Sequence, residues 1–111
     1  MFRCLLLFWS RLLAADGEAL LSDKAVWMIV MSTPEGVELE ARRGCPSVEV
    51  VPEGKVLVSV QLRNSCPVSG NGMVDNFTVD LRTGRIWTGV DVRKYIDSER
   101  LRRLRDLLGR N

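Results

Sequence analysis

The sequence predicts an α+β domain, with a helical N-terminal half, a four-stranded antiparallel sheet and a C-terminal amphipathic helix. The sheet is indicated most clearly by the stretch VLVSVQLR at residues 56–63, where valine and leucine alternate with mainly polar residues. Such alternation is typical of an antiparallel strand with one face on a core and the other toward solvent. The final helix is indicated by Leu101, Leu104 and Leu108, which recur at helical spacing.

The N-terminal half contains two helix signals in succession, which predict two short helices or one kinked helix. Ser22 provides a cap ahead of the apolar run 25–31, and Thr33 provides another ahead of Pro34, which suits a first helical position. Gly44 can end this second helix. The run 25–31 is also short enough to be a buried strand, because apolar periodicity does not separate the two structures over such a length. We expect a helix here.

Strands are expected from residue 47 to residue 90, at 47–51, 55–63, 77–81 and 85–90. The first two flank Pro52, Glu53 and Gly54, which suit a hairpin turn. The last two flank a second turn, where Gly84 supplies a positive φ and Asp80 or Thr83 bonds the turn amides.

The C-terminal helix is predicted over residues 98–108, with Asp97 as its cap and Gly109 as its end. The chain has a formal net charge of only +2, but residues 93–111 contain seven basic and three acidic residues. Glu99 and Arg103 stand at i, i+4 spacing, so the helix supplies some partners for its own cations.

Residues 1–15 fit either a signal peptide or a helix that packs on the sheet, and residues 16–111 form one domain. Arg3, an apolar run and Ala14-Ala15 follow the order of an export signal, although Arg11 interrupts the run. The same segment places apolar residues at helical spacing. A membrane span is not expected, because Arg11 stands where its middle would be.

Three cysteines favour one disulfide, between Cys45 and Cys66. If the hairpin turn pairs Val51 with Val56, Cys45 faces Leu62, and a loop crossing has to close the remaining gap to Cys66. The alternative is two buried thiols in a cytosolic protein. A structural zinc site is not expected, because it needs four thiolate or imidazole ligands and the 111-residue chain has three cysteines and no histidine.

The segment FTVDLRTGRIW at residues 77–87, with the preceding helices and hairpin, is similar to PepSY-like domains, which are small exported bacterial domains. The resemblance covers about residues 22–87. It implies modulation of peptidases or binding in the cell envelope, without catalysis by the domain itself.

The residues predict a binding or inhibitor domain rather than an enzyme, with no cofactor and no metal. Without histidine, a general base near neutral pH would need a strongly shifted carboxylate or lysine. Asp75 and Asp80 fall on opposite faces of one strand, so we expect them at turn and surface positions instead of in a catalytic pair.

The predicted partner is a protein or an envelope component, and the predicted location is periplasmic or secreted. Trp87, Arg102 and Arg105 are the candidate partner surface: Trp87 alternates to the face away from Ile86, where it is either exposed or covered by the N-terminal helix. The alternative is a cytoplasmic protein that binds nucleic acid through its basic C-terminal helix.

Overall fold

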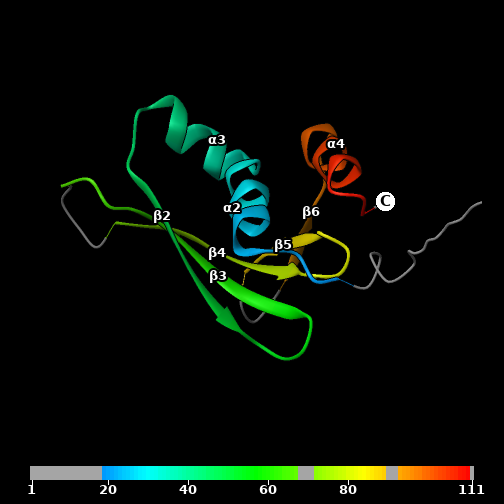
Figure 1. Cartoon of the computed structure of the whole chain (residues 1–111). Coiled ribbons are helices and arrows are strands. Elements are labelled where there is room, and N and C mark those ends of the chain that lie inside the picture. The colour runs from blue at the N-terminus through cyan, green and yellow to red at the C-terminus, as the bar shows by residue number, and fades with distance from the viewer. Residues whose placement is uncertain (1–18, 68–71, 90–92, 111) are drawn as a thin grey trace, which may run out of the picture.

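The computed structural model describes residues 19–67, 72–89 and 93–110 (Figure 1). Its helices are α2 (Asp23–Met31), α3 (Pro34–Ala41) and α4 (Glu99–Leu107), and its strands are β2 (Pro46–Pro52), β3 (Leu57–Asn64), β4 (Met73–Asp80), β5 (Ile86–Thr88) and β6 (Lys94–Ile96). The strands form one antiparallel sheet of five, in the order β2-β3-β4-β5-β6. The predicted α+β class is confirmed, but the predicted count of four strands is wrong. Residues 1–15 lie outside the described ranges.

Of the two arrangements expected, two short helices or one kinked helix, the structure has two separate helices, and the strand alternative for 25–31 is wrong. Thr33 makes the break: its buried hydroxyl donates to the carbonyl of Val30 at 2.6 Å and accepts from the amide of Gly36 at 3.2 Å. A Cβ on Gly36 would lie 2.6 Å from the Cα of Met31, so only glycine allows α3 to start this close to the end of α2.

The hairpin between β2 and β3 has a longer loop than predicted. Val51 pairs with Ser59 and Pro52 with Val58, not Val51 with Val56. The loop spans residues 53–56 and is closed by a 2.9 Å hydrogen bond from the amide of Glu53 to the carbonyl of Leu57. This register places Cys45 beside Ser65, whose amide donates to the Cys45 carbonyl at 2.7 Å. Cys66 directly follows Ser65 and is therefore within reach of Cys45 for a disulfide.

The turn between β4 and β5 follows the sequence prediction. Gly84 has φ 77°, and Asp80 Oδ1 accepts from the amides of Arg82 and Thr83 at 2.8 and 3.3 Å. Thr83 Oγ1 accepts from the amide of Arg85 at 3.2 Å. The strands around the turn differ from prediction, because β4 begins at Met73, beyond a register shift at Leu62/Arg63, and β5 ends at Thr88.

Strand β6 is the element that sequence reasoning missed. It has three residues, too few to show a period, and it pairs with β5 by placing Tyr95 opposite Trp87. The helix that follows is capped by Ser98, whose Oγ accepts from the amide of Leu101 at 3.1 Å. The prediction that Asp97 caps this helix is therefore wrong.

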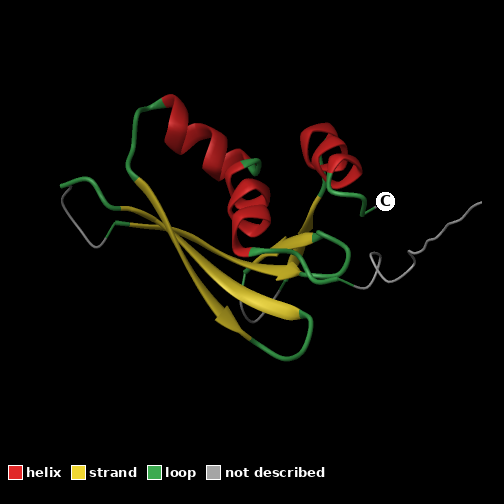
Figure 2. Cartoon of the chain, viewed as in Figure 1, coloured by secondary structure: helices red, strands yellow, loops and turns green. Residues whose placement is uncertain are grey.

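The core lies between one face of the sheet and the three helices (Figure 2). Every second residue of β3 and β4, from Val58 to Leu62 and at Phe77 and Val79, is at most 4% exposed. Leu101 and Leu104 of the predicted leucine stripe are buried with them, while Leu108 is partly buried. Within the described ranges, no helix has the length and apolar content needed to cross a membrane.

Candidate functional site

The face of the sheet turned away from the helices carries the candidate site; we call it the open face. All three described helices lie on the other side of the sheet (Figure 2). Because side chains alternate along a strand, the residues between the core positions point to the open face. The register aligns one such row across all five strands. In sheet order its members are Val51, Ser59, Thr78, Trp87 and Tyr95.

Trp87 and Tyr95 form an aromatic pair within this row. They stand directly opposite each other on β5 and β6, with ring centroids 5.6 Å apart and ring planes at 53°. Trp87 is half-buried and Tyr95 is 41% exposed. The adjacent Ile86 is fully buried, which confirms that Trp87 points away from the core. The N-terminal segment proposed as its cover falls outside the described residues.

A polar row runs beside the aromatic pair. Glu49 pairs with Gln61, and Gln61 pairs with Asn76. The Gln61 carbonyl oxygen accepts from Arg63 Nη2 at 3.1 Å, which holds this amide in place. The rings on β5 and β6 and the amides on β3 and β4 give the open face both apolar contact area and hydrogen-bonding groups, a composition found at many protein-binding surfaces.

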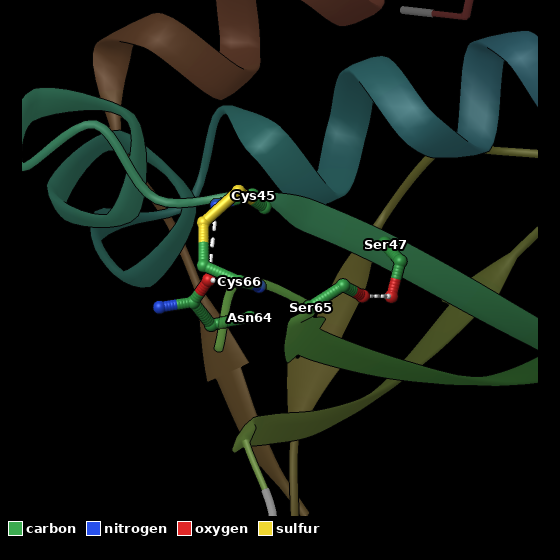
Figure 3. Close-up of a disulfide and its surroundings, with 5 residues drawn as sticks. All are labelled: Cys45, Ser47, Asn64, Ser65 and Cys66. Atoms are coloured by element: carbon green, nitrogen blue, oxygen red, sulfur yellow. Dashed lines mark hydrogen bonds between the residues drawn. A yellow bond between two sulfur atoms is a disulfide. The ribbon is translucent and has the colours of Figure 1, made fainter. Parts of the chain in front are cut away.

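The disulfide joins Cys45 and Cys66, with their Cα atoms 5.1 Å apart (Figure 3). The Asn64 side-chain oxygen accepts from the amides of both cysteines, at 2.9 and 3.2 Å. Ser65 and Ser47 hydroxyls are 2.7 Å apart on the same pair of strands. The predicted disulfide is therefore confirmed, and it fixes the ends of β2 and β3 that lie far from the hairpin loop.

The structure does not bring Trp87, Arg102 and Arg105 to one surface. Arg102 is exposed on α4, where Nη1 donates to Asp97 Oδ1 at 2.8 Å. Arg105 is only 7% exposed, so its assignment to an exposed surface is wrong. It follows Leu101 by four residues and so shares the buried face of the helix. A Cβ on Gly84 would lie 3.2 Å from Arg105 Cγ, which shows how closely the arginine stem covers the β4–β5 turn.

A pair of acids, Glu35 and Asp75, is a feature that sequence reasoning missed. Asp75 pairs with Leu62, so it lies on the covered side of the sheet and is not the surface residue predicted. Its Oδ2 accepts from Thr88 Oγ1 at 3.0 Å and its Oδ1 accepts from the amide of Asn76 at 2.8 Å. The carboxyl of Glu35, in the first turn of α3, contacts that of Asp75. Asp75 stands two residues before Phe77, and this spacing is the signal that could have placed it facing the core.

The pKa of Glu35 is raised, first by burial and then by the negative charges of Asp75 and Glu38, although its own backbone amide opposes the shift. Glu35 Oε1 is buried and receives no N–H or hydroxyl donor. A protonated Glu35 can donate to Asp75, so the pair can share one proton between α3 and β4.

A pocket of about 300 Å³ is lined by Glu35 of this pair, with Lys94 and Tyr95 among its other lining residues. In the ranges 19–67, 72–89 and 93–110 no cluster of three or more His, Cys, Asp or Glu side chains could hold a metal ion.

Comparison with known proteins supplies no relative for this geometry. The chain matches no protein-family model, no curated protein and no solved structure.

Proposed function

We propose that this chain is a non-catalytic binding or inhibitor domain that is exported or envelope-associated, and that Trp87 and Tyr95 on the open face contact a protein or envelope partner. The observation that carries the proposal is the pair of Trp87 and Tyr95 on the open face, with Tyr95 41% exposed. Val51, at the other end of the same row, is 49% exposed, and Thr78 between them is buried. Tryptophan and tyrosine are enriched among the residues that dominate binding energy at interfaces.

Two features support export. Disulfides persist mainly in oxidising compartments, and Cys45 is joined to Cys66. The order of residues in 1–15 resembles that of a signal peptide. The resemblance to PepSY-like domains agrees with a role in the envelope.

The hydrogen bonds of the acid pair support a structural role for these two carboxyls rather than a catalytic one. Both Asp75 oxygens already accept hydrogen bonds, from Thr88 and from the backbone of β4. Glu35 joins this network from α3, so the pair connects a helix to the sheet. The chain also has no histidine to act as a general base near neutral pH.

Site-specific photo-crosslinking in the source cell tests the proposal. A benzophenone amino acid is placed at Val51 on the open face or, as a matched control, at Val37 on α3, which is 37% exposed. We expect an adduct from position 51 in the envelope or secreted fraction and none from position 37.

Trp87→Ser in the Val51-labelled chain should abolish that adduct, since loss of a central aromatic anchor typically costs about 2 kcal/mol or more of binding energy. Trp27→Ser, which alters a tryptophan of 36% exposure on α2, is the control and should leave it unchanged. Equal adducts from both positions would contradict the assignment of the open face, and an adduct removed by nuclease would favour the nucleic-acid alternative.

A further inference from the structure

A groove of about 500 Å³ lies on the helix layer, between the end of α2 and α4. Figure 1 shows both helices on the side of the sheet opposite the open face. The groove is lined by Ser32 after α2 and, from α4, by Glu99, Arg100, Arg103, Leu104 and Leu107. It is therefore a second surface, separate from the aromatic pair.

The apolar part of this groove reaches from the core to solvent. Leu104 is 8% exposed and packs in the core, whereas Leu107, three residues later on the same helix face, is 84% exposed. No described side chain covers Leu107 to any great extent, so an apolar side chain of a partner can contact it and the edge of Leu104 together.

The charges of α4 leave one cation available at this groove. Arg102 pairs with Asp97 and Arg103 pairs with Glu99 four residues earlier. Arg105 is buried. Arg100 is exposed, lines the groove and has no ion pair within the part of the chain that the structure describes. An unpaired guanidinium beside exposed leucines is complementary to a carboxylate beside an apolar side chain.

We propose that the groove between α2 and α4 binds an acidic peptide segment of a partner protein. An apolar side chain of that segment lies on Leu104 and Leu107, and an adjacent aspartate or glutamate accepts hydrogen bonds from Arg100. Nucleic acid fits this groove less well, because phosphate-backbone binding uses several unpaired cations and the ion pairs of α4 leave only Arg100 among its described arginines. The proposal does not depend on the open face.

Selection from a phage-displayed library of random peptides on the full-length, disulfide-bonded chain tests this proposal. Enriched sequences should combine Asp or Glu with Leu, Ile or Phe, and a synthetic peptide of the enriched sequence should shift the amide resonances of Ser32, Leu104 and Leu107. Leu107→Ser should weaken that peptide by roughly tenfold, since a buried leucine is lost from the interface. Arg100→Gln should weaken it by roughly three- to fivefold, and salt should weaken the wild type more than this variant.

The matched controls are Leu20→Ser, at an exposed leucine outside the groove lining, and Arg102→Gln, at an arginine of α4 that does not line it. Both should leave the affinity unchanged. Enrichment of neutral or basic peptides, no enrichment, or equal losses in the control variants would overturn the proposal. Tight binding of duplex DNA that Arg100→Gln weakens would overturn it in favour of nucleic acid. Crosslinking from position 51 is unaffected by any of these results, so the two proposals fail separately.

Discussion

The two faces of the sheet differ although they are built from the same strands. On the covered face Val58, Val60 and Val79 are at most 4% exposed beneath the helices. On the open face the row from Val51 to Tyr95 has no described helix over it, and both ends are more than two-fifths exposed, while Thr78 at its centre is 3% exposed. Because side chains alternate along each strand, the same strands form one face that packs against the core and another face that does not.

The covered face is specified by packing, and its one polar end is specified by hydrogen bonds. Asp75 and Thr88 face the helix layer and are hydrogen-bonded to each other, and Asp75 interacts with Glu35. The open face has no such requirement for apolar residues, so the side-by-side Trp87 and Tyr95 are not explained by the need for a core. This difference is consistent with our proposal that the aromatic pair is a binding surface.

The largest loss of stability that would distinguish the two faces is expected from a substitution on the covered face. Phe77→Ala removes a ring that is 1% exposed, and should lower the free energy of unfolding by about 3–5 kcal/mol. Tyr95→Ala on the open face should cost less than half as much, because the ring already contacts water. Urea denaturation of both variants measures the difference. Equal losses would mean that the open face is as tightly packed as the core.

Loss of the disulfide is expected to cause the next largest decrease in the free energy of unfolding. This decrease does not depend on the packing of either face. It closes a loop with a sequence separation of 21 residues. On the chain-entropy model, its loss in the double variant Cys45→Ala/Cys66→Ala should cost about 3 kcal/mol, mainly by freeing the unfolded chain. The measurement is again urea denaturation, without reductant.

Ser47→Ala is the matched control for this pair, since it removes only an exposed hydroxyl contact at the same end of the sheet. Its cost should stay within about 0.5 kcal/mol. A peptide map of the native protein should also link Cys45 to Cys66. Free thiols in protein taken from an oxidising compartment would contradict both the bond and the export proposal.

Local signals predicted much of this fold, and long-range pairing accounts for most of the differences. Thr33-Pro34 and the β4–β5 turn were predictable because caps and turns depend on neighbouring residues. The predicted register of β2 on β3 was wrong because the composition of a loop does not fix its length. Strand β6 depends on its pairing with β5, which no property of Lys94–Ile96 indicates alone.

The candidate site was predicted only in part, because some of its residues come together through long-range pairing. The direction of Trp87 follows from its position beside Ile86, but its partner Tyr95 comes from the unpredicted strand. The charge of Arg105 predicts a surface position, but its four-residue spacing from Leu101 places it on the buried face of α4. Glu35 and Asp75 are 40 residues apart in the chain, and only the packing of α3 on the sheet brings them together.

The smallest expected effect concerns the polar end of the covered face, and it depends on pH. The pKa of Glu35 is raised in the folded chain, by burial above all and then by Asp75 and Glu38. Its stabilising contribution is therefore complete below the pKa of an unfolded glutamate and is lost as pH rises through the folded value. Above that value two carboxylates face each other, and Lys94 is the one basic residue among the described residues that line the adjoining pocket.

Glu35→Gln should remove this loss, because an amide can donate to Asp75 at every pH. Urea denaturation at a series of pH values, starting below the ordinary glutamate pKa, should show the wild type losing stability relative to this variant as pH rises. Glu40→Gln, at an exposed acid of the same helix, is the control and should follow the wild-type curve. Parallel curves for wild type and Glu35→Gln would mean that the acid pair does not join α3 to the sheet through a shared proton, and the covered face would then depend on its apolar packing alone.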